Sequence, residues 1–245
     1  MHIENRYYIR PGVIEVEQVH SSMVGNHNRR SRRHCPSADA VKKNNKRRVA
    51  KKLRRLIDTN FMPGDLYMTL TYKKGTSKTL EEVEKDIRNL TKRLGYRYEK
   101  LGQPLKWIAA VGIKAPHVHL IINTIDGFNY MKDMANVWGL GFIDIKPLYI
   151  EGRYMALAEY LVKHKEENEK KLGVSLKNKR AYMSSRNLKQ PRKRTIRINE
   201  KVVIRKPKVP TGYRLDMYSE IDQGIYDDTN YHYRYFMLIR AKKRE

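Results

Sequence analysis

Hydrophobic and polar residues alternate in a clear order through the middle of the chain. Four segments have the alternating or mainly apolar pattern of β-strands, namely residues 66–72, 105–113, 117–123 and 142–148. Four others repeat apolar residues every three or four positions, as amphipathic helices do, namely residues 41–58, 80–94, 128–138 and 153–172. Thr79 and Glu82 have capping-box spacing before the second helix, and Gly95 is the expected end of that helix.

The order of these elements predicts an α+β fold. From residue 66 onward it is β-α-β-β-α-β-α, whose first six elements form the split βαβ, ferredoxin-like pattern. We expect an antiparallel sheet of about five strands with helices on one face. His117 and His119 project from one side of their strand, and Val118, Leu120 and Ile122 project from the other side into the core.

Charge divides the chain into three parts. The chain holds 52 Lys and Arg against 26 Asp and Glu. Residues 29–55 and residues 177–208 each hold thirteen of the basic residues and one acid. We therefore expect a basic N-terminal extension with a helix (1–60), a core (61–175) and a basic, β-rich C-terminal extension packed on that core (176–245). Basic arms of this kind favour phosphate backbones over a solvated tail or an anionic lipid surface.

The flanking segments carry weaker patterns. The stretch GVIEVEQV (12–19) alternates and predicts an edge strand, and RTIRINEKVVIRK (194–206) predicts a β-hairpin that turns at Asn199 and Glu200. The stretch YHYRYF (231–236) is either a packed strand or a surface for stacking bases, and its alternation favours packing.

Several features point to a cytoplasmic protein without a membrane segment. Cys35 is the single cysteine, which excludes an internal disulfide and a Cys-rich zinc site. No segment has the apolar length of a membrane span, and the first residues lack an apolar signal core.

Candidate chemistry lies on the third strand and the last helix of the core. Paired imidazoles at His117 and His119 can bind a divalent metal, although two hydrogen-bonded or exposed histidines are the alternative interpretation. Tyr160, Lys163 and His164 share one face of the helix. A nearby metal and cation would favour the phenolate of Tyr160 as a nucleophile, whereas packing beside Leu157 and Leu161 is the other interpretation.

In combination, three motifs resemble the HUH endonucleases, and more narrowly the single-tyrosine replication-associated (Rep) proteins of rolling-circle elements. The motifs are Thr69-Leu70-Thr71, His117-Val118-His119 and Tyr160-Leu161-Val162-Lys163, on strand, strand and helix. The resemblance covers about residues 45–190 and includes the stretches RRLIDTNFMPGDLYMTLTY (54–72) and SSRNLKQP (184–191).

The resemblance implies a mechanism. Tyr160 would attack a phosphodiester in single-stranded or hairpin origin DNA, forming a 5′-phosphotyrosine link and releasing a 3′-OH that primes synthesis. His117 and His119 would hold Mg²⁺ or Mn²⁺ on the scissile phosphate, and Lys163 would position that phosphate or a metal-bound water. The chain has no Walker-type phosphate loop, so a host helicase is the expected partner for unwinding.

One departure from the family pattern concerns the third metal ligand. The family usually supplies a polar ligand on the strand before the histidines, and that strand reads WIAAVGIKAP here. His164 is the preferred substitute, since it follows Tyr160 by one helical turn. The alternative is a weakened metal site in a protein that mainly binds DNA.

The basic arms are expected to contact DNA phosphates, which set register without reading sequence. The residues assigned to these contacts are Lys46, Arg47, Lys51, Lys52, Arg54, Arg55, Arg186, Lys189, Arg192, Lys193 and Arg194. Two other functions remain open at this point: a non-catalytic nucleic-acid-binding protein on the same fold, and a relaxase or transposase with the same chemistry on different DNA.

Overall fold

The chain forms two compact units in a computed structural model that describes residues 1–21, 37–149, 154–176, 179–216, 221–225 and 231–241. One unit, here the core unit, runs from Lys46 to Lys189, and the other combines Met1–Asn45 with Gln190–Glu245. The core unit therefore extends beyond the expected 61–175 at both ends. Most of the basic loop expected at residues 29–40 lies outside the described residues.

The core unit contains the expected five-stranded antiparallel sheet, in the order β6-β3-β5-β4-β7. Its strands are β3 (Leu66–Thr71), β4 (Trp107–Gly112), β5 (His117–Ile122), β6 (Ile143–Pro147) and β7 (Met183–Ser184). Strands β4 and β5 form the expected hairpin, whereas β7 comes from the basic segment after residue 176.

Two helices cover one face of this sheet, α2 (Leu80–Lys100) and α3 (Tyr130–Trp138). Val118, Leu120 and Ile122 pack in this layer, as predicted. The Thr79–Glu82 capping box is present, but the predicted end at Gly95 is wrong. The helix continues because Tyr98, fully buried in its last turn, donates a hydrogen bond to the Asn123 carbonyl at 2.6 Å.

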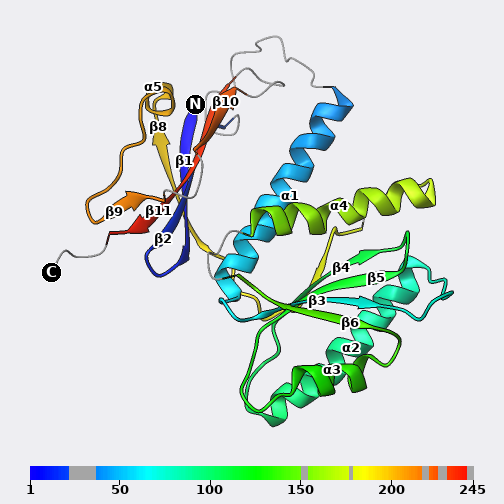
Figure 1. The fold of residues 1–245 in the computed structure, drawn as a ribbon. Coiled ribbons are helices and arrows are strands. Elements are labelled where there is room, and N and C mark those ends of the chain that lie inside the picture. Colours follow the sequence, from blue (N-terminus) through cyan, green and yellow to red (C-terminus); the bar gives the residue numbers. More distant parts are fainter. Residues whose placement is uncertain (22–36, 150–153, 177–178, 217–220, 226–230, 242–245) are drawn as a thin grey trace. The chain divides into compact units, whose positions relative to one another are not determined.

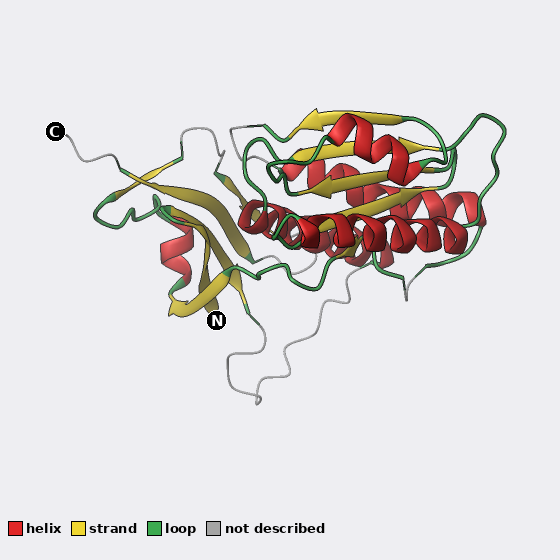
Figure 2. Ribbon diagram, turned by 90° about the horizontal axis from the view of Figure 1, so that it is seen from below, coloured by secondary structure: helices red, strands yellow, loops and turns green. Residues whose placement is uncertain are grey.

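The prediction of helices on one face is also wrong, because helices α1 (Ala38–Asn60) and α4 (Met155–Leu172) lie on the opposite face (Figure 1). Ile108 and Ile121 project to that side and pack in one apolar cluster with residues of α1 and α4 such as Leu53 and Leu161. Figure 2, coloured by secondary structure, shows helices packed along the strands of this unit. The histidine-bearing face of β5 is thus enclosed by helices.

The second unit is a sheet in the order β10-β11-β2-β1-β8, with β9 also paired to β11. Its elements are β1 (His2–Arg10), β2 (Val13–His20), β8 (Arg192–Ile198), α5 (Glu200–Ile204), β9 (Tyr213–Leu215), β10 (Asp222–Ile225) and β11 (His232–Arg240).

Two predictions for this unit are corrected and one is confirmed. Strand β2 lies between β1 and β11, so it is not an edge strand. The hairpin expected over residues 194–206 is instead a strand followed by helix α5, because Asn199 caps the helix and Val203 is buried under it. Tyr235 and Phe236 are buried in β11, which confirms packing for the aromatic stretch. Among the described residues, no helix is long and apolar enough to cross a membrane.

Candidate active site

Strand β5 directs His117 and His119 toward α4, away from the α2–α3 core. Successive residues of a strand point to opposite faces, so these two imidazoles share a side with Ile121. Their partners on β4 are small: Ala110 lies opposite His119 and Gly112 lies opposite His117. Small residues at these positions leave room for the two rings between the sheet and α4.

Gly112 makes room for one imidazole directly. A Cβ atom placed on Gly112 would lie 2.2 Å from Cε1 and 2.6 Å from Nε2 of His117. Contacts of that length are far inside the usual van der Waals separation of about 3.5–4.0 Å. Any side chain at residue 112 would therefore displace the His117 ring.

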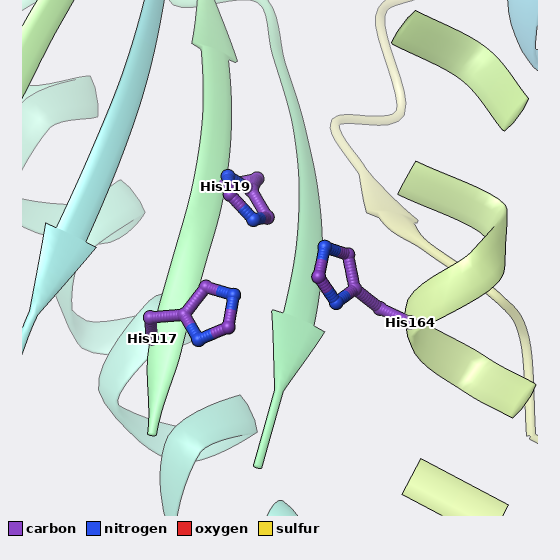
Figure 3. Close-up of side chains that lie close together, drawn as sticks. All are labelled: His117, His119 and His164. Carbon is purple, nitrogen blue, oxygen red and sulfur yellow. The ribbon is translucent and has the colours of Figure 1, made fainter. Parts of the chain in front are cut away.

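Helix α4 supplies a third imidazole, His164, and the candidate nucleophile, Tyr160. Ligand atoms of His117, His119 and His164 all lie within 4.8 Å of one another. Figure 3 shows the two rings from β5 and the ring from α4 converging on the space above β4. This cluster, called here the histidine triad, has the residue types and spacing to hold a metal ion.

Buried polar contacts fix α4 against the end of β4. The Asn168 side chain accepts a hydrogen bond from the Ile113 N–H at 3.0 Å and donates one to the Val111 carbonyl at 2.8 Å. One helical turn later, Lys171 donates to the Ile113 carbonyl. Because His164 lies one turn before Asn168, these contacts set the distance of His164 from the β5 histidines.

Each histidine of the triad has a polar neighbour at Nδ1. In His117 this nitrogen lies 2.6 Å from the Ala115 carbonyl, and in His119 it lies 2.6 Å from the Tyr67 hydroxyl. In His164 it lies 3.3 Å from a carboxylate oxygen of Glu167, although neither ring nitrogen of His164 has a hydrogen-bond partner among the described residues. The Nδ1 atoms thus face protein groups, and Nε2 is the other ligand atom of each ring.

Burial keeps the inner rings of the triad neutral. Desolvation, followed by the charges of His117 and His164, lowers the pKa of His119 to about 3. Desolvation is also the main cause that lowers the pKa of His164. Burial raises the pKa of Tyr67 to about 12, so its hydroxyl is protonated at neutral pH. Neutral imidazoles are the form that binds metal ions.

Tyr160 lies at the edge of the triad and reaches solvent. Its hydroxyl is 3.2 Å from Nε2 of His119, and 44% of the residue is exposed. It lines a cleft of about 490 Å³ together with His117, His119 and residues of β3. Lys73, Lys74 and Lys146 line the same cleft, so positive charge surrounds the phenol.

The structure places the other predicted residues with mixed outcome. Lys163 is exposed and forms an ion pair with Glu167 at 3.1 Å, and it is not among the residues that line the cleft. Lys46 is exposed but paired with Glu166 at 2.7 Å, and Arg47 is half-buried. The remaining residues that fulfil the expected exposure are Lys52, Arg186, Lys189, Arg192, Lys193 and Arg194.

Three residues of the predicted DNA-binding helix require a correction. Lys51, Arg54 and Arg55 are buried, each with less than a tenth of its surface exposed. Arg54 forms an ion pair with Asp58 at 3.1 Å one helical turn later, so its charge is used inside the unit. Because α1 packs on the sheet, these side chains do not offer the exposed charge that a phosphate contact needs.

Sequence reasoning missed three further residues or groups. Tyr67 lies in the recognised Thr-Leu-Thr strand, two positions before Thr69, and that alternation is a signal for the same face. Gly112 and Asn168 depend on contacts between β4, β5 and α4, for which the sequence gives no local signal. The cleft lysines belong to the near-neutral middle of the chain, so the charge pattern hides them.

An antiparallel sheet that presents a histidine triad beside a partly exposed tyrosine fits the Rep-like class of proteins. A family model for replication-associated proteins of the ORF2 type matches residues 65–165. The matched segment includes His117, His119, Tyr160 and His164. It supports a Rep-like protein with a role in rolling-circle replication. Searches of curated proteins and of solved structures found no significant match.

Proposed function

We propose that this protein is a site-specific single-strand DNA endonuclease and strand transferase that initiates rolling-circle replication. The observation that carries the proposal is the distance of 3.2 Å between the Tyr160 hydroxyl and the His119 ring, within a histidine triad. A partly exposed phenol in this position can reach a DNA phosphate in the cleft. The family match over residues 65–165 is the independent support.

The proposed reaction exchanges one phosphate ester bond for another. The Tyr160 oxygen forms a bond to phosphorus, the bond from phosphorus to the 3′ oxygen breaks, and the phenol's proton passes to water in the cleft. The leaving 3′ oxygen takes up a proton and becomes the 3′-OH that primes synthesis. A 5′-phosphotyrosine remains, and attack on it by a 3′-OH reverses the exchange. Because the number of phosphate ester bonds is conserved, rejoining needs no nucleotide cofactor.

The protein's own residues have separate tasks in this reaction. His117, His119 and His164 would hold a divalent ion, which would stabilise the charge that develops on the phosphate. Lys73, Lys74 and Lys146 would bind the phosphates of the strand next to the scissile bond. Lys163 would contact the DNA after releasing Glu167, since both side chains of that pair are exposed.

The proposed DNA is a single-stranded or hairpin origin, with a separate helicase as the partner that unwinds it. Lys52, Arg186 and Lys189 on the core unit, and Arg192, Lys193 and Arg194 on the second unit, would contact phosphates outside the cleft. These contacts give affinity without reading bases.

The experiment that tests the proposal is capture of the covalent intermediate. The full chain is incubated with labelled single-stranded oligonucleotides and Mn²⁺, and SDS-resistant adducts are separated by electrophoresis. We expect an adduct with the unmodified protein and with Tyr96→Phe, which removes a hydroxyl from an exposed tyrosine on α2. We expect none with Tyr160→Phe. An adduct of equal yield with Tyr160→Phe would exclude this nucleophile, and a protein that binds DNA without any adduct would be a non-catalytic binder.

A further inference from the structure

The donor atoms of the triad define the class of metal it takes. We propose that the site selects a transition-metal ion that prefers imidazole nitrogen, and that Mg²⁺ is a poor occupant. Affinity should rise in the order Mg²⁺, Mn²⁺, Co²⁺, Zn²⁺. This inference rests on the metal site of the proposed function and narrows the expectation of Mg²⁺ or Mn²⁺.

The first argument is the absence of oxygen donors from the protein. Among the described residues, the ligand cluster consists of His117, His119 and His164 and contains no carboxylate. Mg²⁺ binds oxygen ligands, usually carboxylates and phosphates, and gives up its water reluctantly. Imidazole suits zinc, iron, nickel and copper, and affinity for nitrogen rises from Mn²⁺ through Co²⁺. Three imidazoles therefore discriminate against Mg²⁺.

The second argument is the tautomer that the surrounding groups impose on the β5 histidines. A carbonyl oxygen can only accept a hydrogen bond, so Nδ1 of His117 carries the proton against Ala115 and the lone pair is at Nε2. The Tyr67 hydroxyl, 2.6 Å from Nδ1 of His119, can accept in the same way. The lone pair of His119 then lies at Nε2, on the side of Tyr160 and the cleft. Tyr67 is thus a positioning residue for the second ligand.

The third argument is the cost of the metal-free state. His164 is 5% exposed, and within the described part of the chain neither of its ring nitrogens has a hydrogen-bond partner. Buried polar atoms without partners are uncommon because their desolvation is not compensated. A metal bond at one of these nitrogens would remove that cost. The Glu167 carboxylate, 3.3 Å from Nδ1, is placed to hold the other nitrogen, as carboxylates do behind metal-bound histidines.

The metal test uses the full chain, freed of metal with a chelator and kept without DNA. Binding of MgCl₂, MnCl₂, CoCl₂ and ZnCl₂ is measured by calorimetry, and the visible spectrum of bound Co²⁺ reports nitrogen ligation. We expect one Co²⁺ or Zn²⁺ per chain, at least 100-fold tighter than Mg²⁺. His164→Ala should abolish the tight binding, whereas His232→Ala, on β11 of the second unit, should leave it unchanged. Equal affinity for Mg²⁺ and Co²⁺, or tight Co²⁺ binding that survives His164→Ala, would overturn the inference.

A second pair of variants tests Tyr67. Tyr67→Phe should lower the Co²⁺ affinity by about 10- to 100-fold, the usual effect of removing an outer partner of a ligand. Tyr154→Phe is the matched control, because Tyr154 is also buried on this face and its hydroxyl donates to the Tyr149 carbonyl. A merely structural Tyr67 would change thermal stability in both variants and Co²⁺ affinity in neither, and that result would refute its positioning role.

These outcomes separate the inference from the proposed function. Selective Co²⁺ binding without any DNA adduct would contradict the endonuclease and leave the metal assignment standing. A DNA adduct together with equal Mg²⁺ and Co²⁺ affinities would contradict the metal assignment alone.

Discussion

Substitution of Gly112 by alanine tests whether the room made by β4 builds the histidine triad. The added Cβ would lie 2.2 Å from Cε1, 2.6 Å from Nε2 and 2.9 Å from Nδ1 of His117. To restore an ordinary contact of about 3.5 Å, the ring must move by roughly 1.3 Å. Metal–ligand distances tolerate only about 0.2 Å. The methyl group therefore removes His117 as a ligand without removing the residue.

The expected effect on stability is small compared with the effect on metal binding. Alanine in a strand gains about 0.5–1 kcal/mol over glycine, and a forced contact costs about 1–3 kcal/mol. His117 is only half-buried, so its ring can swing outward and relieve the contact. We expect Gly112→Ala to fold and to lose more Co²⁺ affinity than the 10- to 100-fold effect of an outer-partner variant.

The assay is a Co²⁺ titration followed by the DNA-adduct reaction. Gly95→Ala is the control, since Gly95 lies inside α2 and an added Cβ meets no atom within 4 Å. It should gain about 0.8–1 kcal/mol of stability from helix propensity and keep full Co²⁺ affinity. If Gly112→Ala binds Co²⁺ as tightly as the unmodified protein does, the ring has room elsewhere and the reasoning fails.

Three other perturbations test separate parts of the structure. Asn168→Leu should reduce the free energy of unfolding by about 2–5 kcal/mol in urea denaturation, because two buried backbone groups lose their partners; equal stability would show that they find other partners. In the metal-free protein, the pKa of about 3 for His119 lies below its unfolded value of 6.5. The unfolded chain therefore takes up the proton first, and stability should fall by up to about 1.4 kcal/mol per pH unit below pH 6.5. His119→Gln should flatten that fall, and an unchanged profile would contradict the assignment. Replacing Lys73, Lys74 and Lys146 by alanine should reduce the slope of log affinity for single-stranded DNA against log salt by about 2, since each phosphate contributes roughly 0.7; an unchanged slope would place the strand elsewhere.

The strands and helices of the core were predictable because their signals are local. Alternation in residues 66–72 and 117–123 and the Thr79–Glu82 capping box need no knowledge of distant contacts. The end of α2 was not, because a buried hydroxyl at Tyr98 outweighs the low helix propensity of Gly95. Helical coverage of the second sheet face was also missed, since charge along α1 reads as a solvent-exposed helix.

The candidate site shows the same division. The histidines of β5 and the Tyr160–His164 helix carry recognisable spacing, so their residue types could be named from sequence. That His164 joins the β5 pair depends on Asn168 fixing α4 to β4, which is a long-range contact. The burial of Arg54 depends on an ion pair with Asp58 inside the packed face of α1. In the second unit, β11 pairs with β2 across more than 200 residues, beyond the reach of local pattern.

Mass spectrometry of the trapped DNA–protein adduct tests the central assignment most directly. After digestion with protease and nuclease, the remaining nucleotide mass should lie on the peptide that contains Tyr160, joined through a 5′ phosphate to the phenolic oxygen. A nucleotide on any other residue, or a tyrosine joined to a 3′ phosphate, would contradict the proposed reaction.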